Sequence, residues 1–342
     1  MQTTVKSLAA QLGFDACRIA RAKEASHATA FRQWLDDGCH GDMAWMARDP
    51  NRRCDPREVL PGCQSVICLA INYYNGSSQL PLAATGGFRI ARYAWNHDYH
   101  ELIAQRLADF DAALRVLGGV QRCYVDTGPV LERDFASDAG LGWNGKSTLQ
   151  IHRQLGTWFF LAEILTTLEL APDPPLGDHC GNCTRCLSAC PTQAITAPHR
   201  VDARRCIAYL TIEHKGPIPE EFRVALGDRI FGCDECLDAC PWNRFAVVSR
   251  ELAFHARPAI FTHRLRDFLD LDDTGFRLLF AGSPIARLKR PRFLRNVCVA
   301  LGNTGSAADL TSLRRAVADP DPLIAEHAAW ALERLRRVLP RA

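Results

Sequence analysis

Seven of the fifteen cysteines in this chain fall in two short runs, and their spacing restricts the possible folds more than any other feature. The first run has the spacing C-x2-C-x2-C-x3-C and is followed by Pro191. The second has the spacing C-x2-C-x3-C and is followed by Pro241. In bacterial ferredoxins, a run of the first kind gives three thiolates to one 4Fe–4S cluster and its fourth to a second cluster. The sequence therefore predicts a segment folded around two iron–sulfur clusters, which is typical of electron transfer.

Two such clusters need eight thiolates, and the two runs supply seven. A symmetric ferredoxin would have the missing cysteine three residues before Cys233, but that position is Ile230. Cys206 lies between the runs, and we expect it to be the eighth ligand. Because the cysteine before each proline serves the opposite cluster, one cluster is predicted on Cys180, Cys183, Cys186 and Cys240. The other is predicted on Cys190, Cys206, Cys233 and Cys236.

Zinc is the main alternative to iron–sulfur clusters for these cysteines. Structural zinc sites use two well-separated C-x2-C pairs that place four sulfurs in a tetrahedron. A third cysteine at the same spacing and a fourth before proline do not suit that geometry, so we favour iron. The other seven cysteines are scattered, and we expect them to be small hydrophobic residues of the core: Cys17, Cys39, Cys54, Cys63, Cys68, Cys123 and Cys298.

The composition is that of an ordinary globular protein, with 47% hydrophobic and 23% charged residues. A chain of 342 residues is long enough for two or three domains. The N-terminal segment lacks the apolar core of a signal peptide, and no stretch has the ~18 apolar residues of a membrane helix. We therefore expect a soluble, cytoplasmic protein, and a monomer, whose cysteines serve redox or metal chemistry rather than disulfides.

Hydrophobic periodicity divides the chain into three parts. The first, residues 1–170, is predicted to be an α/β domain because helical and strand patterns alternate. Helical patterns cover 1–14, 28–46, 99–117 and 131–139, strand patterns cover 65–73, 122–125 and 157–168, and 52–62 is expected to be a loop. A Pro-rich linker then opens a ferredoxin-like domain, 171–245, followed by a helical region, 246–342. In that region 296–302 resembles 327–333, which indicates HEAT-type helical hairpins.

Positive charge is concentrated near the C-terminus. Residues 286–342 contain eleven Lys and Arg but only five Asp and Glu, whereas the whole chain has a net charge of +3. A basic tail on a nearly neutral body indicates a polyanionic partner, although a solvated helical face is the simpler alternative. The basic residues at the start of this tail are Arg287, Lys289, Arg290, Arg292 and Arg295.

Residues 140–147, GLGWNGKS, match the P-loop pattern of nucleotide-binding proteins letter for letter. A P-loop needs a buried strand before it and a helix after it. Here the preceding residues are polar and helix-prone, the following ones are strand-prone, and Trp143 would crowd a phosphate. We therefore reject nucleotide binding, although Lys146 could still meet another anion.

Three carboxylates follow the Gly128-Pro129 turn and are candidates for a general acid: Glu132, Asp134 and Asp138. A carboxyl group in an enclosed apolar site has a raised pKa and can donate a proton near neutral pH. The residues alone do not separate the three candidates, and the alternative is a solvated helix N-terminus.

Taken together, these features resemble the epoxyqueuosine reductase family over nearly the whole chain. The most particular stretches are RCIAYLTIEHKGPIP and GCDECLDACPWN, because the cysteine runs alone are shared with many ferredoxin-like proteins. The similar segments are 91–100, 125–147, 156–166, 178–195, 204–219 and 230–244.

The resemblance implies a reductase with two 4Fe–4S clusters and cobalamin, held base-off in the N-terminal domain. Its substrate would be epoxyqueuosine at the wobble position of tRNA, whose epoxide is reduced to give queuosine and water. An external donor such as a flavodoxin or ferredoxin would supply electrons. Lys215 and the basic tail would contact phosphates of the anticodon stem-loop, and the target base would be splayed into the pocket.

The resemblance also suggests roles for individual residues. It assigns Asp134 as the proton donor, and it places Arg57, His97 and Trp158 where the family contacts the corrinoid. Two other functions are compatible with the motifs. A reductive dehalogenase-like enzyme would use the same cofactors on a small molecule, but the basic tail argues against it. A non-enzymatic ferredoxin-type electron carrier would leave the large N-terminal domain unexplained.

Overall fold

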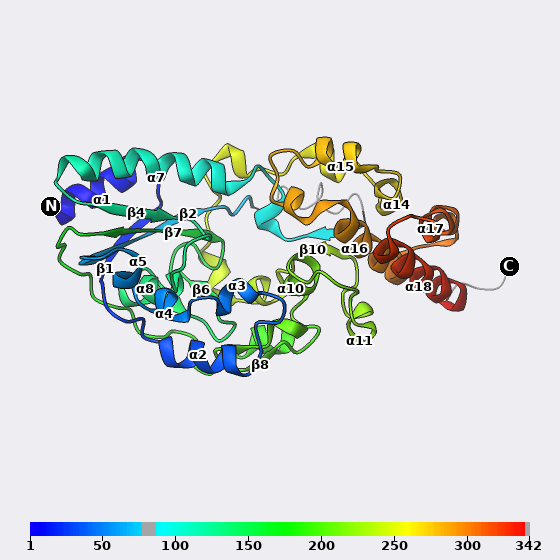
Figure 1. The fold of residues 1–342 in the computed structure, drawn as a ribbon, viewed down its shortest axis with the longest axis horizontal. Helices are drawn as coiled ribbons and strands as arrows, with labels where there is room; N and C mark the ends of the chain where they lie inside the picture. Colours follow the sequence, from blue (N-terminus) through cyan, green and yellow to red (C-terminus); the bar gives the residue numbers. More distant parts are fainter. Residues whose placement is uncertain (77–86, 339–342) are drawn as a thin grey trace.

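The computed structural model describes residues 1–76 and 87–338. Figure 1 shows an elongated molecule with a sheet and its helices at the N-terminal end and a group of helices at the C-terminal end. The segment that carries the cysteine runs lies between them. The last four residues of the basic tail, 339–342, lie outside the described residues.

A four-stranded sheet in the order β1-β2-β7-β4 forms the centre of the N-terminal part. Its strands are β1 (Ala16–Arg21), β2 (Ser65–Asn72), β4 (Gln121–Tyr124) and β7 (Phe159–Thr166). Every residue of β2 and β7 is buried, as their rows of branched and aromatic side chains lead one to expect. The three strands predicted from the sequence are confirmed. All neighbouring strands of this sheet are antiparallel, and helices alternate with them along the chain, in agreement with the predicted mixture of α and β elements.

Helices cover both faces of this sheet (Figure 1). On one face, α1 (Gln2–Gln11) and α7 (Tyr99–Val116) pack against Ile67, Leu69 and Ile71 of β2. On the other face, α8 (Glu132–Asp138) packs against Val66 and Cys68. The two faces alternate along β2 because successive strand residues point to opposite sides. The helices predicted at 1–14, 99–117 and 131–139 are thereby confirmed.

Two predictions for the N-terminal part are wrong in detail. The helix predicted over 28–46 is two helices, α2 (Ala28–Asp36) and α3 (Ala44–Ala47). Between them, Gly38 and Gly41 have φ of 64° and 56°, a left-handed conformation that ends a helix. The loop predicted over 52–62 contains the short helices α4 (Pro50–Cys54) and α5 (Pro56–Val59). Each begins with an aspartate that caps the backbone and a proline at its first position.

The cysteine-bearing segment consists of short elements. Strand β10 (Arg229–Phe231) pairs with β3 (Arg89–Ile90) in parallel and so joins this segment to an earlier part of the chain. The other elements are β5 (Trp143–Asn144), β6 (Gln150–Ile151), α9 (Arg185–Ala189), β8 (Ile195–Ala197), β9 (Arg200–Val201), α10 (Ile207–Ile212), α11 (Glu220–Arg223) and α12 (Glu235–Asp238), with 3-10 turns η2 (Arg92–Ala94), η3 (Ala203–Arg205) and η4 (Pro241–Phe245). The P-loop-like residues 140–147 lead from helix α8 into the β5–β6 hairpin. This order is the reverse of a P-loop, and the rejection of that motif is confirmed.

The C-terminal part is helical and has its own core. Helix α16 (Lys289–Thr304) is buried over most of its length and packs against α18 (Pro322–Val338). The remaining elements are η5 (Leu252–Phe254), α13 (Pro258–Phe261), α14 (Leu265–Phe268), α15 (Asp273–Leu279), η6 (Pro284–Leu288), η7 (Ala307–Asp309) and α17 (Leu310–Val317). The HEAT-type assignment of this region stays a prediction.

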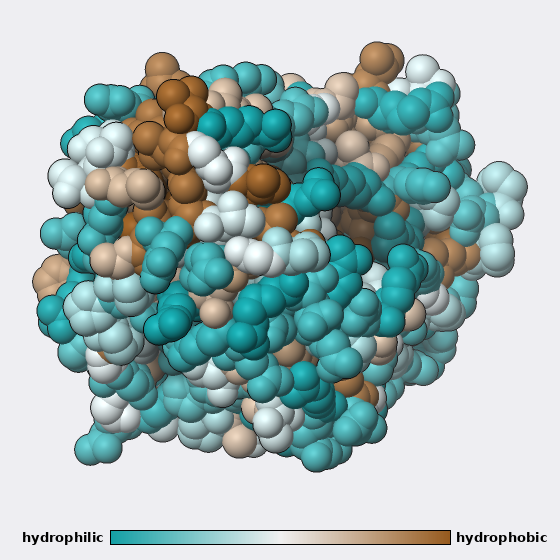
Figure 2. Space-filling view, turned by 60° about the vertical axis from the view of Figure 1, so that its left-hand side comes forward, coloured by the Kyte–Doolittle hydropathy of each residue, from teal (hydrophilic) through white to brown (hydrophobic). Residues whose placement is uncertain are grey.

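The surface is largely hydrophilic on the face drawn in Figure 2, with hydrophobic side chains gathered mainly at its upper left. Exposed hydrophobic residues in the described chain include Val116 and Val120, near the end of α7. Over residues 1–76 and 87–338, no helix has both the length and the hydropathy that crossing a membrane requires.

Candidate active site

The first predicted ligand set lies around a small cavity of about 50 Å³. Cys180, Cys183, Cys186 and Cys240 line it together with Cys236, which also lines the larger cavity described below. Burial raises the pKa of the Cys240 thiol to about 11, and the neighbouring thiols of the first run raise it further. The structure thus brings a cysteine of the second run to three cysteines of the first, as the sequence analysis predicts.

The second predicted ligand set lines one wall of a much larger cavity, of about 420 Å³. Its members, Cys190, Cys206, Cys233 and Cys236, come from both runs and from the segment between them. Burial raises the pKa of Cys236 well above its ordinary value, and the other three thiols add to the shift. All of these cysteines are free thiols in the structure.

Hydrogen-bond donors surround the smaller cavity in a way that suits an anionic cluster. The indole Nε1 of Trp143 is buried without a hydrogen-bond partner. Burial raises the pKa of the adjacent Cys180 thiol, while the backbone N–H of Lys146 and the indole N–H of Trp143 oppose this shift. The Lys146 ammonium donates to the carbonyl oxygens of Gly181 and Cys183 at 2.6 and 3.0 Å. Donors and positive charge of this kind stabilise cysteine-bound iron–sulfur clusters, so the residues present fit one.

The glycines of the GLGWNGKS segment serve this packing rather than phosphate binding. A side chain at Gly142 would lie 2.2 Å from the carbonyl oxygen of Ile151, and one at Gly145 would lie 2.6 Å from the Ile151 side chain. Only glycine lets the β5–β6 hairpin fold this closely over the first cysteine run. The resemblance to a P-loop is therefore a consequence of close backbone packing.

Aromatic side chains from the sheet form the wall of the large cavity opposite the cysteines. They are Tyr73, Tyr93, Tyr99, Phe159 and Phe160. Two carboxylates, Asp126 and Glu132, border the same space. One cavity thus combines a thiol-lined wall, an apolar aromatic wall and acidic groups, which is the arrangement expected of a redox site that also handles protons.

Asp126 directly follows strand β4 and has a φ of 60°, which is uncommon for a residue other than glycine. The Tyr99 hydroxyl donates to its Oδ2 at 2.6 Å, and His100 Nε2 lies 3.7 Å from the same oxygen. Its side chain is 60% exposed. Strained backbone of this kind is concentrated at functional sites. The sequence analysis missed Asp126, although its position between a predicted strand and the Gly128-Pro129 turn was a usable signal.

Glu132 and Glu163 form a carboxyl pair behind the cavity wall. Glu132 begins α8 and borders the cavity, whereas Glu163 is buried in β7, opposite Cys68 of β2. The two carboxyl groups lie close enough for each to shift the pKa of the other. Burial raises the pKa of Glu132 to about 7, and the charge of Asp126 adds to this shift. Burial and the nearby Glu132 raise the pKa of Glu163 well above its ordinary value.

Asp134, the proton donor suggested by resemblance, does not line the cavity. Its buried carboxylate accepts hydrogen bonds from the backbone N–H and ring Nδ1 of His27, both at 2.8 Å, and from Asn144 at 3.2 Å. Residues two apart on a helix point to different sides, so Glu132 and Asp134 cannot both face the same space. Asp138 is also held elsewhere, by Ser26 and Lys23.

The three residues expected to contact the corrinoid are not brought to the cavity either. Arg57 pairs with Asp55 on the exposed helix α5. His97 is exposed in the turn before α7. Trp158 is buried in the core, with the Arg92 guanidinium 4.8 Å from its ring centre. Its two chain neighbours, Thr157 and Phe159, line the cavity instead.

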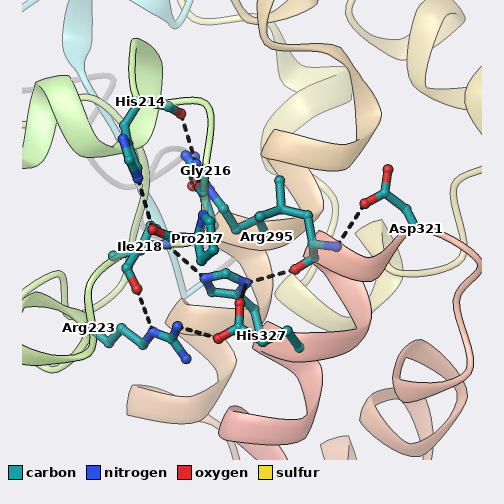
Figure 3. A network of polar contacts seen from close by, with 11 residues as sticks. His214, Gly216, Pro217, Ile218, Arg223, Arg295, Asp321 and His327 are labelled. Carbon is teal, nitrogen blue, oxygen red and sulfur yellow. Dashed lines mark hydrogen bonds and ion pairs between the residues drawn. The ribbon is translucent and has the colours of Figure 1, made fainter. Parts of the chain in front are cut away.

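Three of the six basic residues expected to meet phosphates are turned inward. Arg295 is fully buried and donates to the carbonyl oxygens of Leu210, His214 and Gly216 at 2.7 to 2.8 Å (Figure 3). The chain folds in this way because the turn around Gly216 leaves carbonyl groups that need buried donors. Arg290 is paired with Asp319, and Arg292 donates to backbone carbonyls. Arg287, Lys289 and Lys215 remain exposed.

His327 of α18 completes the same network (Figure 3). Its Nε2 accepts the backbone N–H of Ile218 at 3.1 Å, and its Nδ1 lies 2.7 Å from the carbonyl oxygen of Leu323. These contacts define a neutral ring with the proton on Nδ1. Burial lowers the pKa of His327 to about 4. The C-terminal helices thus hold the segment that follows α10, which carries the exposed Lys215.

Comparison with known protein families identifies two matches. A model described as "4Fe-4S double cluster binding domain" matches residues 179–243, which contain all eight predicted ligands. A model described as "Epoxyqueuosine reductase QueG, DUF1730" matches residues 53–127. The iron–sulfur interpretation of the cysteine runs is confirmed by the first match, and the zinc alternative is set aside.

Full-length relatives agree with these matches. A protein of Xanthomonas campestris pv. campestris named epoxyqueuosine reductase is 43% identical over 96% of this chain and 94% of its own length. A crystal structure of epoxyqueuosine reductase with an epoxyqueuosine-modified tRNA-Tyr stem loop is 28% identical, with a TM-score of 0.91 over 97% of this chain and 89% of that one. A Bacillus subtilis epoxyqueuosine reductase, described with its catalytic aspartate loop swung out of the active site, is also 28% identical, with a TM-score of 0.88 over 97% and 90% of the two chains.

Proposed function

The chain belongs to the epoxyqueuosine reductase family, and we propose that it reduces the epoxide of epoxyqueuosine in tRNA to the alkene of queuosine, releasing water. The observation that carries this function is the single cavity shared by four cluster-type cysteines and by Asp126. Such a cavity lets electrons and protons reach one substrate atom in a space from which much of the water is excluded. Epoxide reduction needs both electrons and protons.

The redox cofactors fit the two cavities. The cysteines around the smaller cavity would hold one 4Fe–4S cluster, and those on the wall of the larger cavity would hold the other. The aromatic wall of the larger cavity offers flat apolar contacts for the corrinoid of cobalamin. When bound, the clusters supply single electrons and cobalamin supplies low-potential electrons to a carbon centre. An external flavodoxin or ferredoxin is the expected source of these electrons.

Asp126 is the side chain best placed to protonate the epoxide oxygen. It borders the cavity, whereas Asp134 does not. It also lies on the loop between β4 and α8, whereas Asp134 is inside α8. The catalytic aspartate of the Bacillus subtilis relative belongs to a loop that can leave the active site. Protonation by Asp126 would avoid expelling an unprotonated oxygen, which is slow at neutral pH.

The basic surface beside the cavity would hold the RNA. Of the described basic residues discussed above, Lys215, Arg287 and Lys289 are exposed and therefore able to meet phosphates. Arg287 also contacts Asp98 and His100, and His100 lies near Asp126. A phosphate bound at Arg287 would thus lie close to the cavity that receives the modified base.

The experiment that tests this function is single-turnover reduction of an epoxyqueuosine-containing anticodon stem-loop. The protein is reconstituted anaerobically with iron, sulfide and cobalamin, reduced chemically, and the RNA is digested for nucleoside analysis by mass spectrometry. We expect queuosine to replace epoxyqueuosine only when the reductant and both cofactors are present. Unchanged epoxyqueuosine with fully loaded protein would contradict the proposed function.

A further inference from the structure

The reaction consumes two protons, and Asp126 can carry only one at a time. Reducing an epoxide to an alkene breaks two C–O bonds, forms one carbon–carbon double bond, and takes up two electrons. The oxygen leaves as water, so two O–H bonds form. The second proton therefore reaches Asp126 either from solvent, to which its side chain is 60% exposed, or from a protonated group beside the cavity.

The pair formed by Glu132 and Glu163 is a group of the second kind. Glu132 shares the cavity with Asp126, and Glu163 lies behind it in the middle of the sheet. Two carboxyl groups that lie this close retain a proton between them, because both cannot be ionised at such close range. Oε1 of Glu163 is buried without any partner among the described donors, as expected if the pair and not the rest of the protein holds the proton.

We propose, on the basis of the function above, that Glu132 and Glu163 hold the proton for the second O–H bond and pass it through Glu132 to Asp126. Asp126 gives its first proton to the epoxide oxygen and is then protonated again by Glu132 of the pair. It then gives the second proton as the remaining C–O bond breaks and water leaves. The electrons come from the redox cofactors and their external donor. Glu132 and Glu163 act on the substrate only through Asp126. They are therefore positioning residues, which hold the proton that Asp126 delivers.

The charges around the pair keep it protonated, and the cavity lies on its Glu132 side. Asp126 faces it from the β4–α8 loop and raises the pKa of both members. Arg133 on α8 and Arg53 on α4 oppose this effect at Glu132. On the inner side, Glu163 faces the buried thiol of Cys68, whose pKa is raised well above its ordinary value. Tyr124 of β4 is paired with Glu163 on the other side of β7. Of the two carboxyl groups, Glu132 is the one that lines the cavity.

Isosteric variants test the proposal. Glu132→Gln and Glu163→Gln keep the shape of the pair and remove its transferable proton. We expect kcat for the epoxyqueuosine stem-loop to fall at least about 10-fold, with KM unchanged, since proton transfer by a positioned group contributes this much or more. Wild-type kcat should decline as the pH rises through about 7, where Glu132 loses its proton, and the variants should lack this decline. Glu169→Gln, an exposed carboxylate just beyond β7, is the matched control.

A second measurement does not depend on turnover. Infrared difference spectra of the holoenzyme should contain a protonated carboxyl band that titrates near pH 7, and this titration should be absent from both variants. If a Gln variant fails to fold, Glu163→Asp, which withdraws the carboxyl group from Glu132, takes its place and should lower kcat in the same way. Variants with wild-type kcat and pH dependence, or without a change in the band, would overturn the proposal. Wild-type protein that forms no queuosine would instead refute the function on which it rests.

Discussion

The hydroxyl group of Tyr99, at the start of α7, donates to Asp126 at the end of β4 over 2.6 Å. This contact joins a helix of one sheet face to the loop that enters the cavity. It holds the aspartate in its left-handed conformation and orients one oxygen, so that the other can turn toward a bound substrate.

Asp126→Asn should lower kcat by about 10²-fold, because the amide cannot deliver a proton to the epoxide oxygen. Stem-loop affinity and iron content should be unchanged, since no ligand cysteine or exposed basic residue is altered. Turnover of epoxyqueuosine stem-loop, followed by nucleoside analysis, measures the effect. Tyr99→Phe should give a smaller loss, because it removes only the orientation of the acid. Normal turnover by Asp126→Asn would exclude this residue as the donor.

Asp134→Asn should act on stability. The carboxylate of Asp134 now accepts two hydrogen bonds from His27, and the amide would offer a neutral oxygen and an NH2 group in its place. The free energy of unfolding should therefore fall by about 1–3 kcal/mol. Thermal unfolding of the reconstituted protein measures this change. A loss of turnover as large as that of Asp126→Asn, with normal unfolding, would return the proton-donor role to Asp134.

Lys146→Met should make the cluster of the smaller cavity harder to reduce. The ammonium group, bound to carbonyls of the first cysteine run, favours the more negative reduced cluster, so its removal should lower the reduction potential. Redox titration followed by electron paramagnetic resonance measures the potential. Lys23→Met, which alters an ion pair with Asp138 and touches no cysteine, is the control. An unshifted potential would show that this charge is screened from the cluster.

Arg295→Met should destabilise the C-terminal part by roughly 3 kcal/mol, because three carbonyl groups lose buried donors. Burial already lowers the pKa of this guanidinium to about 9, which reflects how little water reaches it. The midpoint of thermal unfolding should fall accordingly. Arg336→Met, at an exposed position of α18, should change it little. If Arg295→Met weakened RNA binding without affecting unfolding, the residue would belong to the RNA surface after all.

Stability should fall as the pH drops from 6.5 to about 4. Burial lowers the pKa of His327 and His152 from 6.5 to about 4, so in this range the unfolded chain binds protons that the folded chain does not. For His327 the effect amounts to at most about 3 kcal/mol. His327→Gln should reduce the pH dependence of the unfolding midpoint. An equally steep dependence in that variant would show that other groups cause it.

The sequence predicted the parts of the molecule in which local pattern and packing agree. The apolar run of β2 and the helical period of α7 fold as expected because each buries one strongly marked face. The cysteine runs identified their cofactor because iron–sulfur ligation requires close, regular spacing. The failures lie where longer-range contacts decide. Gly38 and Gly41 divide a predicted helix by their backbone conformation.

The site shows the same division more sharply. From the sequence alone, Asp134 could not be distinguished from the neighbouring carboxylates. The orientation of the helix about its own axis decides which of them faces the cavity. From the sequence, Arg295 was expected to be an exposed basic residue. In the structure it is buried, because it donates hydrogen bonds to the carbonyl groups of a turn about 80 residues earlier. The role of Glu163 could not be predicted from the sequence. It is a single acidic residue in an apolar strand, and only the fold shows that Glu132 packs against it.

In the predicted ligand sets the two runs exchange a cysteine, so the assembly of one cluster would depend on that of the other. Cys190 leaves its own run for the large cavity, and Cys240 leaves its run for the small one. Inserting iron at either cavity therefore fixes both stretches of backbone and prepares the remaining cavity. Half-loaded molecules should be rare. When iron is scarce, a cell would then contain fewer complete copies rather than many impaired ones, and the supply of the metal would set the amount of working protein.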